Sequence, residues 1–174
     1  MEQKNRNRKH DKKHEQKREV MLMRHYLSQY YRAVLRRSQL EDRLRNVCAE
    51  MDAPIGGINY SPVNYSSVGK TSSGSASFTF RKSEIETRIE EQKKEIEASL
   101  LRIMDVMDYL DPISDERMIL ELYYIDRLPW KEVQKRASMS RSTCYEYRDK
   151  GINQLLSFKR VRILIEKYGK EKGL

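Results

Sequence analysis

The sequence predicts an all-α protein in which a long helical hairpin of the coiled-coil type is followed by a C-terminal helix-turn-helix domain. Apolar residues recur three or four positions apart along residues 19–51 and 83–110, a spacing that is typical of amphipathic helices. A stretch rich in Gly, Pro, Ser and Asn, residues 52–80, lies between them and is expected to form a flexible loop. Residues 128–156 then read as a short helix, a tight turn and a longer helix.

The composition favours thin helical bundles over a large enzyme core. Of the 174 residues, 38% are hydrophobic, 35% are charged and 9% are aromatic. The sequence has no run of 18 or more apolar residues and its N-terminus is charged, so we expect neither a membrane span nor a signal peptide. Cys48 and Cys144 are the only cysteines, and no second Cys or His lies at ligand spacing. These features predict a reduced, cytoplasmic protein without a disulfide or a zinc site.

Basic charge is concentrated at the two ends of the chain, whose net charge is +9. Residues 1–18 hold eight Lys or Arg against three acids, residues 127–174 hold thirteen against five, and the remainder has a net charge of −4. Such ends suit phosphate neutralisation, although basic tails also arise as solvated, disordered ends. Because residues 1–18 are too polar to pack, we expect a disordered basic arm or a frayed extension of the following helix there.

The two long helices each carry one apolar stripe. The first stripe consists of Val20, Met23, Leu27, Tyr30, Val34, Leu40, Leu44, Val47 and Met51. Ser83 and Glu86 have the spacing of a capping box that would begin the second helix, and Pro112 disfavours helix beyond Asp111. The second stripe consists of Ile85, Ile89, Ile96, Leu100, Ile103, Met107 and Leu110. The helices would pair as an antiparallel hairpin, and pairing between two chains in a homodimer would serve equally well.

Residues 112–174 are expected to form the C-terminal domain. Ser114 can cap a helix that carries acidic residues in its first turn and runs to about Asp126. Its inward residues would be Met118, Ile119, Leu122 and Ile125. Trp130 and Val133 would anchor the next short helix, with residues 137–139 as the turn, and the hydroxyl of Ser140 would cap the longer helix 140–156. A helical pattern then continues through Phe158, Val161, Leu164, Ile165 and Tyr168 toward a frayed end.

The helix 140–156 has two distinct faces. The predicted buried stripe consists of Cys144, Tyr147, Gly151, Ile152 and Leu155, and the predicted outward face consists of Arg141, Ser142, Tyr145, Glu146 and Asp149. An outward face that begins with Arg and Ser at a helix N-terminus suits a DNA major groove. A helical pair that only packs against the rest of the chain is the alternative. Arg141 could equally be solvated or bound to a phosphate.

The run from Asp111 to Leu155 resembles the fourth conserved region of bacterial sigma factors. The matching residues are Arg117, Leu120, Leu122, Tyr124, Ile125, Trp130, Glu132, Val133, Ser140, Arg141, Ser142 and Thr143. The order of elements along the whole chain looks like that of the small late-gene transcriptional regulators encoded by Gram-positive phages and prophages. Gln134 and Ser138 depart from the sigma pattern, which has a small Ala and a Gly there. A left-handed turn residue other than Gly costs on the order of 1 kcal/mol, which is tolerable.

The resemblance implies specific contacts with double-stranded DNA. Arg141, Ser142 and Glu146 would face bases, and Thr143 would lie with them in the opening turn. The side chains expected near phosphates are Tyr145, Arg148 and Lys150. It also implies a phage or prophage late-gene activator that reads promoter DNA with helix 140–156, and whose long helices serve dimerisation or contact with RNA polymerase.

Two other functions remain open, and no enzyme is expected. A DNA-packaging component, such as a small terminase subunit, also joins DNA-binding helices to coiled-coil helices but usually places the DNA-binding domain first. A coiled-coil scaffold would leave the basic motif unexplained. Gly69-Lys70-Thr71 is no phosphate loop, because Asn64 stands where that motif needs Gly. The three histidines have no partners at metal spacing, so we expect no metal and no cofactor.

Overall fold

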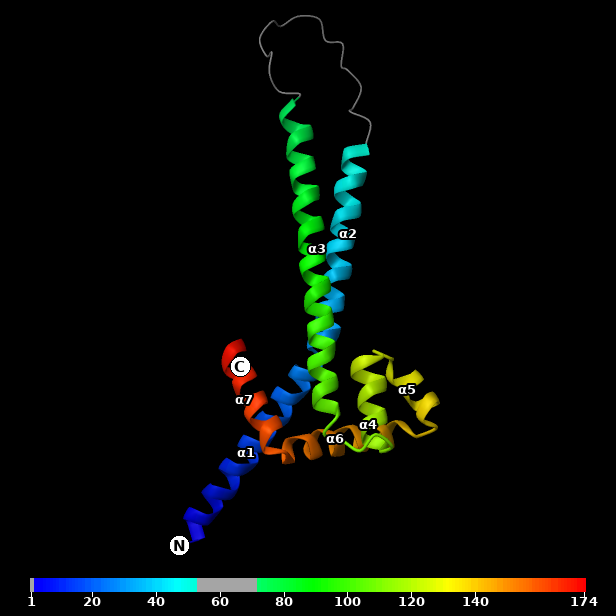
Figure 1. Ribbon diagram of the computed structural model, residues 1–174. Coiled ribbons are helices and arrows are strands. Elements are labelled where there is room, and N and C mark those ends of the chain that lie inside the picture. The colour runs from blue at the N-terminus through cyan, green and yellow to red at the C-terminus, as the bar shows by residue number, and fades with distance from the viewer. Residues whose placement is uncertain (1, 53–71) are drawn as a thin grey trace, which may run out of the picture. The chain divides into compact units, whose positions relative to one another are not determined.

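Helices are the only regular secondary structure in the described part of the protein, which confirms the predicted all-α class (Figure 1). The structure is a computed structural model that describes residues 2–52 and 72–174, with side-chain surroundings for 14–51 and 76–174. Its helices are α1 (Glu2–Leu27), α2 (Gln29–Asp52), α3 (Ser72–Met107), α4 (Asp115–Leu120), the π-helix η1 (Glu121–Ile125), α5 (Trp130–Ala137), α6 (Arg141–Ser157) and α7 (Lys159–Lys172). None of the helices described is long and apolar enough to cross a membrane.

The chain divides into two compact units. Unit 1 comprises residues 1–32 and 97–174, and unit 2 comprises residues 33–96. Unit 2 therefore contains most of α2 and the first part of α3 (Figure 1). Along each helix, a set of buried or half-buried positions recurs in steps of three and four: Ala33, Arg37, Leu40, Leu44 and Val47 in α2, and Ile85, Ile89, Gln92 and Ile96 in α3. That alternation is the spacing of coiled-coil seams.

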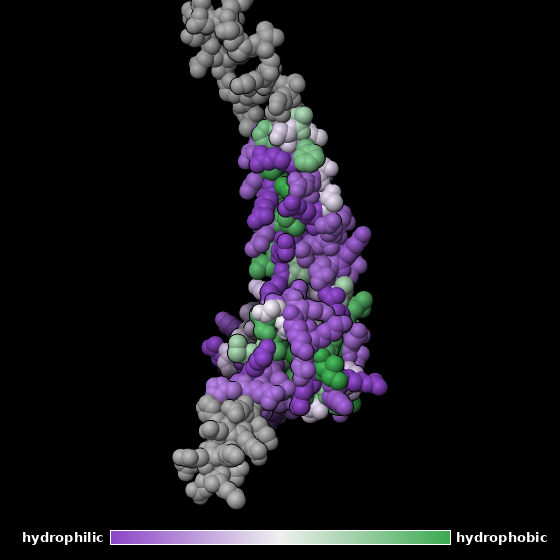
Figure 2. Space-filling view, turned by 90° about the vertical axis from the view of Figure 1, so that its left-hand side faces the viewer, coloured by the Kyte–Doolittle hydropathy of each residue, from purple (hydrophilic) through white to green (hydrophobic). Residues whose placement is uncertain are grey.

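The outer faces of the unit 2 helices are charged. Arg45 pairs with Asp42, and Arg88 pairs with Glu84 at 2.5 Å, each about one helical turn apart. Hydrophilic residues predominate over the visible helical surface, and hydrophobic residues appear there only as small separate areas (Figure 2). The 35% charged content of the sequence is thus accounted for by helices that bury a narrow stripe.

The expected single helix over residues 19–51 is divided at Ser28. The hydroxyl of Ser28 donates a hydrogen bond to the backbone oxygen of Arg24 at 2.7 Å. A serine that bonds back to the preceding turn competes with the regular helical ladder and bends the helix. The apolar spacing is the same on both sides of Ser28, so periodicity alone could not reveal this break.

Two segments differ from the unstructured regions that were expected. Residues 2–18 belong to α1, which agrees with the expected helix extension and not with the disordered arm, because Lys, Arg, Gln and Glu propagate a helix readily once a packed segment has started it. The second long helix begins at Ser72 rather than at Ser83, so residues 72–80 are not part of a loop. Ser83 does not cap a helix: its backbone oxygen accepts from the Thr87 hydroxyl at 3.0 Å within α3. The remaining expected loop, residues 53–71, lies outside the described residues.

Unit 1 is built around one core to which both ends of the chain contribute. We expected residues 112–174 to form a domain of their own, but α1 and the last turns of α3 share their core. The buried residues of this core are Leu22, Met23, Tyr26 and Leu27 from α1, Ile103, Val106 and Met107 from α3, Leu110, Leu120 and Tyr124, Ile152, Leu155 and Leu156 from α6, and Val161, Ile165 and Tyr168 from α7. The C-terminal pattern forms a separate helix because Phe158, with ψ 120°, breaks the chain direction between α6 and α7.

His25 of α1 lies against α7. Its Nδ1 is 2.9 Å from the hydroxyl of Tyr168, and Arg32 hydrogen-bonds its Nε2. Burial, followed by the positive charges of Arg32 and Lys172, lowers the pKa of His25 below its ordinary value of 6.5. The folded protein therefore favours the neutral imidazole.

We expect the stability of unit 1 to fall as the pH drops below 6.5 through the lower pKa of folded His25. In that window the unfolded chain binds a proton that the folded chain does not, so acid favours unfolding. Melting temperatures by circular dichroism at pH 7.5 and 5.5 would measure this. His25→Gln should show a smaller loss than the native chain, whereas His14→Gln, at an exposed position of the same helix, should not. Equal losses for the native chain and His25→Gln would contradict the assignment.

Candidate nucleic-acid interface

Helices α4, α5 and α6 meet around a second, small core. Ile119, Val133 and Cys144 contribute one fully buried side chain from each helix. Burial raises the pKa of the Cys144 thiol, so this cysteine is a neutral apolar side chain, as the sequence suggested. The partly buried residues packed around the three are Leu122, Tyr123, Leu128, Trp130, Ala137, Met139 and Tyr147. This core fixes α6 against the two preceding helices.

The entry to this region is determined by local hydrogen bonds. The hydroxyl of Ser114 accepts from the backbone N–H of Arg117 at 3.3 Å, which confirms the predicted cap of α4. The guanidinium of Arg117 pairs with Asp108 at 2.9 Å and with Glu121 at 2.7 Å. The pairs link the end of α3 to α4 and raise the pKa of Arg117, chiefly through Glu121.

The π-helix η1 changes the predicted inward face. The backbone N–H of Asp126 bonds to the Glu121 oxygen at 2.9 Å, five residues back. The wider turn rotates the residues that follow, so Tyr124 is buried whereas the expected Leu122 and Ile125 are only half-buried. Before the π turn, Leu120 is buried and the expected Met118 is half-buried. Burial raises the pKa of Tyr124 to about 12. Period 3.6 could not predict this shift, since a π turn contains one extra residue.

The turn between α5 and α6 takes the predicted left-handed conformation without a glycine. Ser138 has φ 54° and ψ 38°, and the next backbone N–H, that of Met139, bonds to the Gln134 oxygen at 3.1 Å. The side chain of Gln134 folds onto its own helix, where Nε2 donates to the Trp130 oxygen at 3.0 Å. Gln134 is half-buried, so α5 accommodates the larger side chain without displacing α6.

The start of α6 is capped as predicted. The hydroxyl of Ser140 accepts from the backbone N–H of Thr143 at 3.2 Å. The same oxygen lies 2.8 Å from the hydroxyls of Ser142 and Thr143. Ser142 remains exposed, whereas Thr143 is half-buried. A group of hydroxyls therefore surrounds the helix N-terminus, where the macrodipole favours negative charge.

The two faces of α6 agree with the predicted division in most positions. Cys144, Gly151, Ile152 and Leu155 are buried, and the structure adds Leu156 to this stripe, while Tyr147 is half-buried. Of the predicted outward face, Arg141, Ser142 and Glu146 are exposed, whereas Tyr145 and Asp149 are half-buried. Lys150 is exposed as well. The ammonium of Lys150 lies 4.9 Å from the centre of the Tyr147 ring, which restricts its reach.

Tyr145 and Arg148, both expected near phosphates, are engaged within the protein. The Tyr145 ring packs edge-on against Trp130 with centroids 4.5 Å apart. The Arg148 guanidinium lies 5.0 Å from the Tyr145 ring centre and 5.5 Å from that of Trp130, and it pairs with Asp149 at 2.8 Å. Only 16% of its side chain is exposed. The sequence placed these residues correctly on α6 but could not show that α5 supplies Trp130 to cover them.

We did not identify the basic residues of α5 from the sequence. Lys131, Lys135 and Arg136 are exposed on this helix, which packs directly against α6. The sequence offered one signal for them: Lys135 and Arg136 follow Lys131 by four and five residues, so basic side chains gather on a short helix, with Lys131 and Lys135 on the same face. They add positive charge next to the start of α6.

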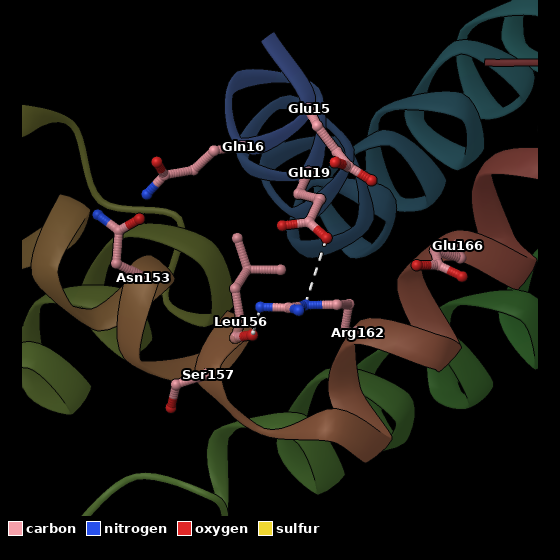
Figure 3. A pocket seen from close by; sticks show the side chains of 8 residues that line it. All are labelled: Glu15, Gln16, Glu19, Asn153, Leu156, Ser157, Arg162 and Glu166. Atoms are coloured by element: carbon pink, nitrogen blue, oxygen red, sulfur yellow. Dashed lines mark hydrogen bonds and ion pairs between the residues drawn. The ribbon is translucent and has the colours of Figure 1, made fainter. Parts of the chain in front are cut away.

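One flank of α6 is unsuited to nucleic acid. A polar pocket of about 410 Å³ lies between α1, α6 and α7 (Figure 3), lined by Glu15, Gln16, Glu19, Asn153, Leu156, Ser157, Arg162 and Glu166. Its basic residue, Arg162, pairs with Glu19 at 3.3 Å. Three carboxylates would repel a phosphate backbone, so the candidate interface is restricted to the N-terminal half of α6 and to α5.

Comparison with protein-family models, curated proteins and solved structures gives no match for this chain. Among the described residues, no three His, Cys, Asp or Glu side chains lie close enough together to hold a metal ion.

Proposed function

We propose that this protein is a DNA-binding transcriptional regulator in which α5 and α6 act as a helix-turn-helix. The observation that carries the proposal is the start of α6. There Arg141, Ser142 and Glu146 are exposed on the first two turns of a helix that Ser140 caps and a buried core holds in place. The N-terminal turns of a recognition helix are the part that meets base edges in the major groove.

The exposed side chains match the chemistry of base edges. Arginine donates two hydrogen bonds to O6 and N7 of guanine, serine bonds to several bases, and glutamate accepts from N4 of cytosine. Arg141, Ser142 and Glu146 therefore supply both donors and acceptors.

The charge around these residues supports binding to phosphates. Residues 127–174 hold thirteen Lys or Arg against five acids. Neutralising phosphates with such residues releases counterions, which drives binding and makes it sensitive to salt. The exposed Lys131, Lys135 and Arg136 of α5 are suited to this role.

The regulatory part of the proposal concerns unit 2. The seam spacing of α2 and α3 is that of a helical hairpin, which we propose serves dimerisation or contact with RNA polymerase. Together with the resemblance to sigma region four and to phage late-gene regulators, this supports a phage or prophage activator. Transcription in vitro from a template that carries a DNA site selected for binding to this protein would test this part. A transcript level that is the same with and without the protein would contradict it.

Arg141→Ala is expected to weaken binding to the selected DNA roughly 10- to 100-fold, because a bidentate contact to guanine is worth about 1–3 kcal/mol. The site is first selected from random double-stranded DNA, and dissociation constants are then measured by gel shift. Arg43→Ala is the matched control, since Arg43 is an exposed arginine of unit 2. Binding by Arg141→Ala at the native affinity would contradict the proposed reading helix.

A further inference from the structure

A continuous set of contacts joins α1 to the first turn of α6. The guanidinium of Arg24 pairs with Asp149 at 2.9 Å, and the same Oδ1 of Asp149 accepts from Arg148 at 2.8 Å. Arg148 lies over the Tyr145 ring, and the Tyr145 hydroxyl accepts from Arg141 at 3.0 and 3.1 Å. We call these residues the Arg24 network: Arg24, Asp149, Arg148, Tyr145 and Arg141.

The network rests on a fixed aromatic base. Trp130 stacks on Tyr123 of η1 with centroids 4.3 Å apart and planes 22° apart, and it also contacts the Tyr145 ring and the Arg148 guanidinium. Tyr145 is therefore confined between Trp130 and Arg148. Its hydroxyl is an acceptor whose position is determined before any ligand arrives.

Asp149 balances two arginines at the centre of the network. Arg148 is 16% exposed, and the Nε of Arg24 is buried without a hydrogen-bond partner among the described residues. Without the Asp149 carboxylate, the two guanidinium groups would lose their shared acceptor and repel each other, although solvent partly screens this repulsion because the Arg24 side chain is 41% exposed. The position of Arg148 thus depends on Asp149, which Arg24 in turn holds from α1.

From these contacts we propose that Arg24 is a positioning residue for DNA recognition, which acts through Asp149, Arg148 and Tyr145 to hold the Arg141 guanidinium ready for a base contact. This inference rests on the proposed function and goes beyond it, because it makes α1 part of the reading apparatus and removes Arg148 from the phosphate contacts. A side chain held in its binding conformation loses less entropy when it binds.

Asp149→Asn and Arg24→Gln in the full chain are expected to weaken binding to the selected double-stranded DNA about tenfold. Binding to unrelated DNA of the same length should not change, since the phosphate contacts remain. Tyr145→Phe should give the same result by removing only the hydroxyl. Because Tyr145→Phe keeps the ring, it tests the same contact if Arg24→Gln does not fold. Dissociation constants from fluorescence anisotropy at several salt concentrations measure these effects, with thermal melting to verify folding.

Glu19→Gln is the matched control. The Glu19–Arg162 pair also connects α1 to the C-terminal helices, at 3.3 Å, but it contacts α7 and lies outside the Arg24 network. This variant should keep the native affinity for both DNAs. If Glu19→Gln weakened binding to the selected DNA as much as Asp149→Asn does, a general effect of loosening α1 would replace the positioning role.

Two further results decide the inference. In the double variant Arg24→Gln with Arg141→Ala, we expect no loss of affinity beyond that of Arg141→Ala alone, because both changes disable the same contact. Additive losses would overturn the inference. For Arg148→Ala, we expect the slope of the logarithm of the association constant against the logarithm of the salt concentration to stay unchanged. A magnitude of this slope lower by about 0.9 would show that Arg148 contacts a phosphate and would overturn the inference. Native affinity of Arg141→Ala would instead overturn the proposed function itself, so the two failures are distinguishable.

Discussion

Leu27→Ala is expected to lower the free energy of unfolding of unit 1 by roughly 2–5 kcal/mol, the usual range for removing a fully buried leucine side chain. Leu27 lies at the end of α1 with 0% of its surface exposed, in the core that α1 shares with α3, α6 and α7. The loss should therefore affect the C-terminal helices, although they are more than 70 residues away in the sequence. Urea denaturation followed by the fluorescence of Trp130 measures it, because Trp130 is the only tryptophan.

Met21→Ala is the control for this prediction, since the Met21 side chain lies on the same helix and is 69% exposed. It should change the unfolding free energy by less than about 0.5 kcal/mol. A second measurement of the same dependence uses a fragment of residues 112–174, which lacks α1 and should not unfold cooperatively. A fragment that melts like the full chain, or a Leu27→Ala protein as stable as Met21→Ala, would show that α1 is not part of this core.

Gly151→Ala is expected to destabilise unit 1 by roughly 1–3 kcal/mol, the usual cost of overpacking. A Cβ at Gly151 would lie 2.8 Å from Cδ1 of Leu120, 3.2 Å from Cβ of Glu116 and 3.4 Å from the Glu116 oxygen. Leu120 is fully buried, and the Glu116 atoms belong to or adjoin the α4 backbone, so α4 and α6 must separate. Alanine favours a helix by about 1 kcal/mol over glycine, which offsets only part of this cost. The separation should also weaken binding to DNA.

Gly169→Ala, in α7, is the matched control. A Cβ there would meet only the two methyl groups of Leu22, at 3.1 and 3.2 Å, and an oxygen at 3.8 Å. A flexible side-chain end can shift by a few tenths of an ångström, so the gain in helix preference should leave the stability almost unchanged. Thermal melting of the two variants under identical conditions compares them. Equal stability of the two proteins would contradict the close contact between α4 and α6.

The features that the sequence predicted correctly are those fixed by neighbouring residues. The caps at Ser114 and Ser140 need only a hydroxyl three residues before a free backbone N–H. The left-handed Ser138 is required by the short connection between α5 and α6. The exposed start of α6 follows from the spacing of its buried residues. In each case, the information lies within one or two helical turns.

The features that the sequence did not predict depend on distant residues or on a local change of helical period. The break at Ser28 separates α1 from α2, and the π-helix η1 changes the helical period after α4, but the apolar spacing of the sequence is regular at both places. The helical state of residues 2–18 follows from a helix that packing stabilises further along the chain. Tyr145 and Arg148 were expected near phosphates, but Tyr145 packs against Trp130 and Arg148 pairs with Asp149.

The sequence by itself therefore determined an all-helical chain with basic ends and a capped helix whose first turn presents Arg141, Ser142 and Glu146. Each of these follows from composition or from contacts within a few residues. Only the tertiary structure decided that α1 completes the core beneath that helix and that Arg24 reaches Asp149. An apolar stripe shows that one face of a helix must be buried, but it does not specify which other helix covers that face. The packing of the whole unit determines which helices are in contact.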